Sequence, residues 1–544
     1  MRISFFRHCE CSEAIQVISG LLRCTRNDKV WWYFHIFGQN VKIIEMKKLF
    51  SEIVQIEKLV PGGQGLGVLS SGKTVFIWNA LPGEKVVAEI YKMKSSYAEA
   101  VAVEILESSP YRIPPRDDCY LSTSPWQMMD YEFELQMKTE LVDEIFRQNK
   151  IDLVDTAAGS SAAAQLFSES STRFSDEKRI FLTQPTGSNF DELDLSNSTK
   201  SGSAGLPAYD VFLGKSDSEK TVALAKARIV TDNKDFFYRN KMEYSLWWDN
   251  DKRKIFLAFH KRGSHQKIPI AQSSIERPEI FAEATRIVTE LNANQEEARK
   301  YQSLLVRCNQ KGEVSSALFE NYQSHPTMKN LTDDILGQEY SYSPNGFFQI
   351  NLPVYEMALK EIARHLGNAE KVVDMYSGVG TIGLSVARDR ELTLVETDKN
   401  AFKELLRNVE GEAFAATPLR ATLSDGESVR EDTRDDGLAG RRKMVVGKRP
   451  VKAIHAKSEE ALDYITDDIT LILDPPRAGL DEKVIARILG TKPPRVIYLS
   501  CNPATQARDI AKLLPKYKIT HHQAFNFFPR TPHIENLIAL EISN

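Results

Sequence analysis

The spacing of apolar residues separates a β-rich N-terminal region from a C-terminal region of alternating strands and helices. From Ile53 to about Pro114, short apolar alternations are interrupted by Gly, Pro, Ser and Asn, as in "VPGGQGLGVLSSGKTVFIW". Runs of β-branched residues between such turn residues are typical of a small β-barrel. We therefore expect residues 46–114 to form one barrel domain.

The middle of the chain mixes helical and strand patterns. Residues 126–148 carry apolar positions at helical spacing, which predicts an amphipathic helix that packs on the next domain. Strand patterns such as "KIFLAF" and a helix from about Glu279 to Asn292 follow. Residues 115–335 thus read as an α+β domain, with an insertion or disordered loop at 156–220, which is rich in Ser, Ala, Gly and Thr.

The C-terminal third has the pattern of a parallel sheet. The short apolar runs "KVVDMY", "LTLVE", "ITLILD" and "RVIYLS" are separated by helical segments. Strands buried on both faces read as near-continuous apolar runs, and βαβ units connect them. We expect a doubly wound α/β domain over 336–544, interrupted by an insertion at about 411–450.

Length and composition bound the class of protein. A chain of 544 residues, 42% hydrophobic and 26% charged, is typical of a globular protein with several domains. No apolar run reaches the roughly 20 residues of a membrane span. Six scattered cysteines form no disulfide framework, which favours the cytoplasm. The net charge of −4 gives no global basic surface for nucleic acid.

The first 45 residues lack clear helix or strand periodicity. They contain Cys9, Cys11 and Cys24, and "MKKLFSEIVQIEKLV" from Met46 reads like a natural start. We treat residues 1–45 as an extension of uncertain status and expect translation to begin at Met46, with a genuine short extension as the alternative.

A glycine-rich turn in the C-terminal domain predicts a nucleoside cofactor. In "VVDMYSGVGTIGLSVA", Gly378, Gly380 and Gly383 follow a strand and open a helix. Glycine allows the backbone to approach a ligand, and Glu396, at the end of the next strand, can accept hydrogen bonds from ribose hydroxyls. The motif serves NAD and S-adenosylmethionine equally well.

Three further segments carry candidate chemistry. "LILDPPRAGLD" sets Asp474 in a rigid loop at the carboxyl edge of the sheet, where open α/β sheets bind ligands. Dehydrogenases do not need this element, so it favours a methyltransferase, although Arg477 replaces the aromatic residue of many base-nitrogen methyltransferases. Cys501 lies between a strand and a helix, where backbone N–H groups and the helix dipole favour a thiolate. Glu535 follows a Pro-rich turn and begins the last strand.

With these motifs assembled, residues 46–544 resemble the TRAM-bearing RNA (uracil-5-)-methyltransferase family, which includes 23S ribosomal RNA enzymes. The resemblance rests on "FFQIN", "YRNKMEYSLW", the glycine loop, "DPPR", "SCNP" and "HIEN" in this order. It implies an OB-like TRAM barrel that binds RNA, a central α+β domain and a Rossmann-like class I methyltransferase domain. The barrel candidates for RNA contact are Lys73, Phe76, Trp78, Lys92 and Lys94, although either aromatic residue can equally be barrel core.

The resemblance also assigns roles to individual residues. Gln349, Tyr376, Glu396 and Asp474 would hold S-adenosylmethionine. Cys501 would attack carbon 6 of uracil, because carbon 5 is otherwise too weak a nucleophile to accept a methyl group. Glu535 would then remove the proton from carbon 5. The implied substrate is a uridine in RNA, with 23S ribosomal RNA favoured. On chemical grounds we expect this uridine to be flipped out of the folded RNA, because carbon 6 must be reached from above the ring.

Two features depart from the family pattern. Many relatives carry four cysteines for an iron–sulfur cluster ahead of the amphipathic helix, whereas "PRDDCYLSTSPWQ" keeps only Cys119. We expect no cluster and assign no metal ligand. Lys457 stands where relatives tend to have an acidic residue, so it receives no cofactor role.

Several alternatives remain open at this point. The enzyme could modify transfer RNA or another base, the chain could be a non-catalytic RNA-binding relative, or it could be an NAD-linked oxidoreductase. We expect a monomer without a membrane partner.

Overall fold

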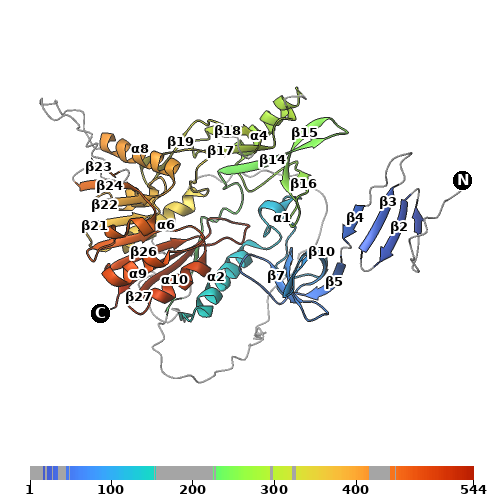
Figure 1. Ribbon diagram of the computed structural model, residues 1–544, viewed down its shortest axis with the longest axis horizontal. Helices are drawn as coiled ribbons and strands as arrows, with labels where there is room; N and C mark the ends of the chain where they lie inside the picture. Colours follow the sequence, from blue (N-terminus) through green and yellow to red (C-terminus); the bar gives the residue numbers. More distant parts are fainter. Residues whose placement is uncertain are drawn as a thin grey trace, which may run out of the picture.

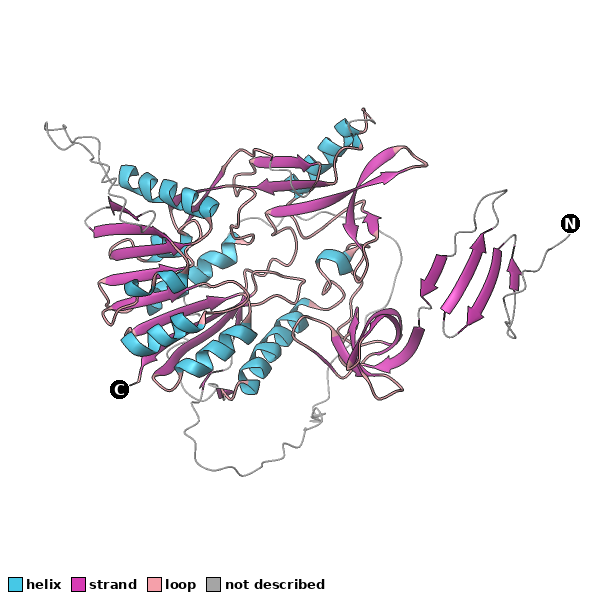
Figure 2. Ribbon diagram, viewed as in Figure 1, coloured by secondary structure: helices cyan, strands magenta, loops and turns pink. Residues whose placement is uncertain are grey.

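The computed structural model describes side chains for residues 50–151, 228–294, 298–321, 326–410 and 450–543 (Figures 1 and 2). Elsewhere it gives only the backbone of a few strands and one helix end. The expected insertion at 156–220 and most of the one at 411–450 therefore lie outside the described residues. Among the described helices, none is long and apolar enough to cross a membrane.

The first 45 residues differ from the sequence expectation. Their backbone contains an antiparallel sheet in the order β1-β2-β3-β4, although no strand periodicity was expected there. The strands are β1 (Gln16–Ile18), β2 (Leu21–Arg26), β3 (Lys29–Phe34) and β4 (Ile44–Lys47). Pairing with neighbouring strands, which no local pattern reveals, defines them.

The expected barrel follows this sheet. Its strands pair in the order β5-β9-β10-β8-β7-β6. They are β5 (Phe50–Gln55), β6 (Lys58–Leu59), β7 (Gly65–Val68), β8 (Thr74–Trp78), β9 (Lys85–Met93) and β10 (Tyr97–Glu107). A Cβ added at Gly67 would lie 2.4 Å from Cγ1 of Val54, so β7 passes very close over β5.

The central domain contains a five-stranded antiparallel sheet in the order β16-β15-β14-β17-β18. Helix α4 (Pro278–Leu291), predicted almost to the residue, packs on this sheet through a buried stripe of four apolar side chains, Ile280, Ala284, Ile287 and Leu291. The strands are β14 (Lys241–Asp249), β15 (Lys254–His260), β16 (Lys267–Pro269), β17 (Ser303–Cys308) and β18 (Val314–Phe319). The short helix α1 (Tyr120–Thr123) precedes it, and the hairpin β19 (Leu331–Ile335) and β20 (Gln338–Tyr342) follows it.

The C-terminal domain is the predicted α/β domain. Its nine-stranded sheet has the order β13-β27-β28-β26-β25-β21-β22-β24-β23, with a parallel centre from β24 to β26. The strands are β13 (Ile229–Val230), β21 (Lys371–Met375), β22 (Glu391–Glu396), β23 (Arg441–Val446), β24 (Arg449–His455), β25 (Ile469–Leu473), β26 (Arg495–Ser500), β27 (Tyr517–Phe525) and β28 (Glu535–Ile542). β23, at the end of the segment expected as an insertion, is an antiparallel edge strand.

Helices cover both faces of this sheet (Figure 2). On one face lie α2 (Tyr131–Gln148), α9 (Glu482–Thr491) and α10 (Pro503–Leu513). On the other lie α6 (Leu352–His365), α7 (Thr381–Val386) and α8 (Lys399–Ala415). The smaller elements are two 3₁₀ turns, η2 (Ser458–Glu460) and η3 (Leu462–Tyr464), and the parallel pair β11 (Leu153–Val154) and β12 (Leu224–Ala225).

Helix α2 is shorter than its apolar pattern predicted and begins at Tyr131 rather than near 126. The Asp130 side chain caps it by accepting hydrogen bonds from the backbone N–H groups of Glu132 and Phe133. As expected, it packs on the following domain: its buried side chains share one core with α9, α10 and the nine-stranded sheet. Helix α2 contacts the loop after β27 and therefore lies beside the candidate site.

Candidate active site

Three of the predicted site residues meet at one edge of the nine-stranded sheet. Asp474 directly follows β25, and Cys501 directly follows the adjacent parallel strand β26. β28 runs antiparallel to β26 with Ser500 opposite Asn536, so its first residue, Glu535, lies at the same edge as Cys501. The electrostatic coupling of Cys501 to both carboxyl groups agrees with this placement.

The Cys501 thiol is neutral in the free protein, contrary to the expectation from its place at a helix start. Asn502 caps α10 with its own side chain. Burial raises the pKa of Cys501 to about 11, and the charges of Glu535 and Asp474 raise it further, while Arg477 lowers it. Desolvation and two neighbouring carboxyl groups therefore outweigh the backbone N–H groups that favour a thiolate.

The two carboxyl groups are themselves hard to ionise. Glu535 is 4% exposed, and burial together with Asp474 raises its pKa well above the ordinary glutamate range. Burial raises the pKa of Asp474 to about 7. Carboxyl groups with raised pKa values are stronger proton acceptors once ionised, which is the property of a general base.

Arg477 and His533 complete the surroundings of Cys501, and the sequence reasoning gave neither a role. Nη2 of Arg477 lies 3.4 Å from Nδ1 of His533. The backbone carbonyl of Arg477 accepts hydrogen bonds from Asn502 (2.8 Å) and Thr505 (3.1 Å), which hold the Arg477 loop against the start of α10. Burial and Arg477 lower the pKa of His533 to about 4, so this ring is neutral. The sequence signal for a role of Arg477 was its place in the "PPR" that follows Asp474.

The predicted cofactor residues lie around the glycine turn between β21 and α7. Glu396 accepts hydrogen bonds from the backbone N–H of Gly378 (2.8 Å) and of Asp398 (2.5 Å). Tyr376 has a positive φ of 66°, which is strained for a non-glycine residue, and its hydroxyl accepts a hydrogen bond from Ser458 at 2.8 Å. A Cβ at Gly378 would point into open space. The turn therefore leaves room for a ligand beside an acidic side chain.

Gln349 lies in the segment between β20 and α6, which the central domain holds in place. Its backbone carbonyl accepts a hydrogen bond of 3.0 Å from Nδ2 of Asn240, and Arg307 donates to the carbonyl of Phe348 at 2.7 Å. Two residues further on, Asn351 is 1% exposed. Neither its side-chain nitrogen nor its side-chain oxygen has a hydrogen-bond partner among the described residues.

Buried polar atoms without partners support a ligand site at this turn. Oδ1 of Asp374 has no hydrogen-bond partner among the described residues, whereas Oδ2 accepts a hydrogen bond of 2.8 Å from the N–H of Gly383. Native proteins rarely leave such atoms unsatisfied. Together with the free side chain of Asn351 and the open space at Gly378, this fits a polar nucleoside cofactor such as S-adenosylmethionine.

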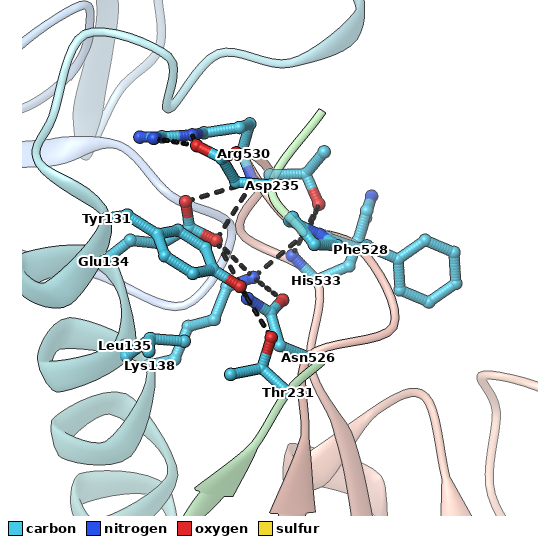
Figure 3. A network of polar contacts seen from close by, with 12 residues as sticks. Tyr131, Glu134, Leu135, Lys138, Thr231, Asp235, Asn526, Phe528, Arg530 and His533 are labelled. Atoms are coloured by element: carbon cyan, nitrogen blue, oxygen red, sulfur yellow. Dashed lines mark hydrogen bonds and ion pairs between the residues drawn. The ribbon is translucent and has the colours of Figure 1, made fainter. Parts of the chain in front are cut away.

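A buried ionic network holds the loop between β27 and β28, which carries His533 and leads to Glu535 (Figure 3). Glu134 and Lys138 of α2 form a fully buried ion pair of 2.9 Å. Lys138 also donates to Oδ1 of Asn526 (2.6 Å) and to the carbonyl of Phe528 (3.1 Å). Both carboxylate oxygens of Glu134 accept from the backbone N–H of Arg530 at 3.0 Å.

The Arg530 side chain extends this network to two further segments. Its guanidinium pairs with Asp235, which precedes the central sheet, and donates to the carbonyl of Met129 at 2.6 Å. The helix and the central domain thus fix the loop from two sides.

The barrel also touches this loop. A Cβ at Gly63, in the turn between β6 and β7, would lie 2.5 Å from Cβ of Pro532, and the carbonyl of Gly63 accepts a hydrogen bond of 3.0 Å from the Trp126 indole. The backbone of the barrel therefore packs directly against the loop that carries His533.

The barrel residues expected to contact RNA have mixed environments. Val75 and Ile77 are fully buried, while Phe76 and Trp78 are half-buried, so the view of these two aromatic residues as barrel core is wrong. The Arg262 guanidinium of the central domain lies 4.3 Å from the ring centroid of Trp78. Lys92 pairs with Glu99 at 2.7 Å, and Lys73 donates to the carbonyl of Lys94 at 2.9 Å.

Family comparisons agree with this geometry. A model described as tRNA (Uracil-5-)-methyltransferase matches residues 441–543, which contain Asp474, Cys501 and Glu535, and a TRAM domain model matches residues 53–103. Over these segments the chain is similar to the RNA (uracil-5-)-methyltransferase family. The matches identify it as an RNA methyltransferase that depends on S-adenosylmethionine.

Relatives extend over most of the methyltransferase. A Bacillus cereus (strain ATCC 10987 / NRS 248) protein named "Uncharacterized RNA methyltransferase" is 25% identical over 502 residues, 90% of this chain and 96% of that protein. One from Chlorobaculum tepidum with a similar name is 27% identical over 493 residues, covering 88% and 92%. The solved Pyrococcus abyssi tRNA (uracil-54, C5)-methyltransferase, in complex with S-adenosyl-L-homocysteine, covers 90% of this chain and 100% of its own, with a TM-score of 0.57 and 18% identity. This last likeness supports the fold.

Proposed function

We propose that the methyltransferase modifies carbon 5 of a uridine through a covalent bond between Cys501 and carbon 6 of the base. The juxtaposition of Cys501 with Glu535 at one strand edge carries this proposal. Addition and later elimination at neighbouring carbons require a nucleophile and a base close to each other.

The residues around the glycine turn supply the cofactor site. Gln349, Tyr376, Glu396 and Asp474 would hold S-adenosylmethionine, which supplies an electrophilic methyl group when bound. Glu396 is preorganised for a ribose by two backbone N–H groups that fix its carboxylate. Asn351, with both polar side-chain atoms unpartnered, joins this set.

Cys501 has to lose its proton before it attacks. Arg477 is the neighbouring positive charge that favours the thiolate, and the ionised form of Asp474, whose pKa is about 7, can accept the thiol proton, which leaves Glu535 for the later step. The sulfur then bonds to carbon 6, and the ring electrons move to form an enolate with a nucleophilic carbon 5. Once carbon 5 carries the methyl group, Glu535 takes its proton, the double bond re-forms and the sulfur leaves.

We infer that the substrate is a structured RNA, with 23S ribosomal RNA first and transfer RNA second. The TRAM barrel beside the catalytic loop supports a large RNA that contacts both. Transfer RNA is the substrate named for the Pyrococcus abyssi structure and in the description of the matching family model. We place the protein in the cytoplasm, because its few scattered cysteines fit a reducing compartment, and we propose that it acts as a monomer.

Trapping of the covalent adduct tests the mechanism. RNA containing 5-fluorouridine cannot release the enzyme, because Glu535 cannot remove fluorine from carbon 5 as it removes a proton. We expect a denaturation-resistant complex with the wild-type protein and S-adenosylmethionine, none with Cys501→Ala, and an unchanged yield with Cys119→Ala, whose thiol is buried in the central core. Absence of the wild-type adduct, or its persistence in Cys501→Ala, would refute the mechanism.

Two further measurements separate the alternatives. Parallel reactions on ribosomal RNA and on bulk transfer RNA, with the methylated nucleoside identified by mass spectrometry, decide the substrate and the base. Calorimetric titration with S-adenosylmethionine and with NAD decides the cofactor, since an oxidoreductase would bind NAD and form no adduct.

A further inference from the structure

A cluster of two histidines and one glutamate lies away from the candidate active site. Glu361 and His365 are one turn apart in α6, and His521 faces them from β27. All three side chains are partly buried. The carbonyl of His365 accepts from Arg495 (3.4 Å), which begins β26, whereas Cys501 follows the end of that strand. A strand of this length spans about 20 Å, so the cluster is remote from the thiol.

One nitrogen of each histidine ring lies close to the same carboxylate oxygen of Glu361. Oε1 of Glu361 lies 3.1 Å from Nε2 of His365 and 3.3 Å from Nε2 of His521. Zn²⁺ bonds to nitrogen and oxygen of about 2.0–2.1 Å, set at tetrahedral angles, place the ligand atoms about 3.3 Å apart. The spacing of the two nitrogens from the oxygen therefore already matches that around a small tetrahedral cation.

The Nε2 atom of His521 is buried and makes no hydrogen bond among the described residues. A polar atom in that state lacks the interaction that compensates for its lost hydration. An unpartnered imidazole nitrogen facing a carboxylate is the donor that a metal ion of the zinc class takes.

Backbone irregularity places His521 on the α6 face of the sheet. The pairing of β27 with β28 shifts between Ile519 and His521, which marks a β-bulge. Bulges re-aim side chains. His522, the next residue, faces the opposite side, where its ring contacts Phe146 of α2 at a centroid distance of 4.9 Å.

We propose that Glu361, His365 and His521 form a binding site for one divalent transition-metal ion of the Zn²⁺ class. The three side chains supply two nitrogens and one oxygen, and water completes the tetrahedron. Arg364 pairs with Glu361 and would hold its carboxylate in place. The ion would fasten the end of α6 to β27, and these are the two elements whose other ends lead to Gln349 and to the loop before Glu535.

Metal titration of the full chain tests the site independently of methylation. The protein is stripped with a chelator and titrated with Zn²⁺ against a chromophoric indicator. We expect the wild type to bind one equivalent that His365→Ala and His521→Ala each bind at least tenfold more weakly. His265→Ala, at an exposed turn, is the matched control and should bind as the wild type does.

Co²⁺ replaces Zn²⁺ in a second measurement that reports the ligands. We expect visible absorption bands of a tetrahedral nitrogen and oxygen site, lost in His521→Ala, and a Zn²⁺-dependent rise in melting temperature that disappears with Glu361→Gln. Circular dichroism verifies that the variants fold. Equal Zn²⁺ affinity in the wild type and His521→Ala, or sulfur-to-cobalt charge-transfer bands as the only signal, would overturn the proposal.

Discussion

Lys138 carries a charge into the interior beside the catalytic loop, and its replacement tests how that loop is held (Figure 3). All three N–H donors of its ammonium group are used: by Glu134, by Asn526 and by the carbonyl of Phe528. Lys138→Met keeps an unbranched side chain that is one atom shorter, and it supplies no donor. In this variant the Asn526 side chain, the Phe528 carbonyl and the Glu134 carboxylate each lose one partner.

The expected loss of stability follows from this count. Removing one partner of a buried ion pair costs about 3–5 kcal/mol. Glu134 keeps the backbone N–H of Arg530, which places the cost near the lower end, at about 3 kcal/mol. Lys58→Met is the matched control. Lys58, in β6, pairs at 2.5 Å with Glu144 of α2, the helix that carries Lys138, but the Lys58 side chain is 50% exposed. Exposed pairs contribute about 0–1 kcal/mol.

Urea unfolding followed by the tryptophan signal and by activity measures both variants. We expect Lys138→Met to unfold at clearly lower urea and to lose kcat at temperatures where it is still folded, because the loop that positions Glu535 loosens. An equal shift in Lys138→Met and Lys58→Met would refute the energetic argument. Full kcat in folded Lys138→Met would refute the positioning argument.

Three further predictions concern the barrel contact, the base and the domain interface. Gly63→Ala should lower kcat about tenfold or more because its new Cβ meets Pro532, whereas Gly62→Ala, also at positive φ but with open space around it, should retain kcat. Only the ionised form of Glu535 can act as the base, and its pKa is raised, so kcat/KM should begin to fall at a pH well above 4.5, the ordinary pKa of glutamate. In Asp474→Asn this fall should occur at lower pH, because one neighbouring negative charge is gone. A double-mutant cycle of Trp78→Ala and Arg262→Ala, measured by thermal unfolding, should give a coupling energy of about 0.5–2 kcal/mol, and additive effects would contradict the contact.

Local patterns specified much of the catalytic domain. The apolar runs that became β21, β22, β25 and β26 are buried on both faces, and that burial is what makes such runs visible in a sequence. Asp474 and Cys501 were placed at adjacent strand ends for the same reason, since parallel strands end at one edge. The capped start of α2 was missed by a few residues, because apolar spacing continues through the turn before Asp130.

Long-range contacts decided the rest. The sequence gives the type and order of chemical groups, but the ionisation of Cys501 depends on burial and on Glu535 and Asp474, which only the packed sheet brings near. The same holds for the cluster of Glu361 and His521, which are far apart in the chain and meet because α6 covers β27. The pattern of side chains along the backbone thus determined the strands, helices and motifs of this methyltransferase. Desolvation and distance between residues remote in sequence, which exist only after folding, determined how its site is charged and held.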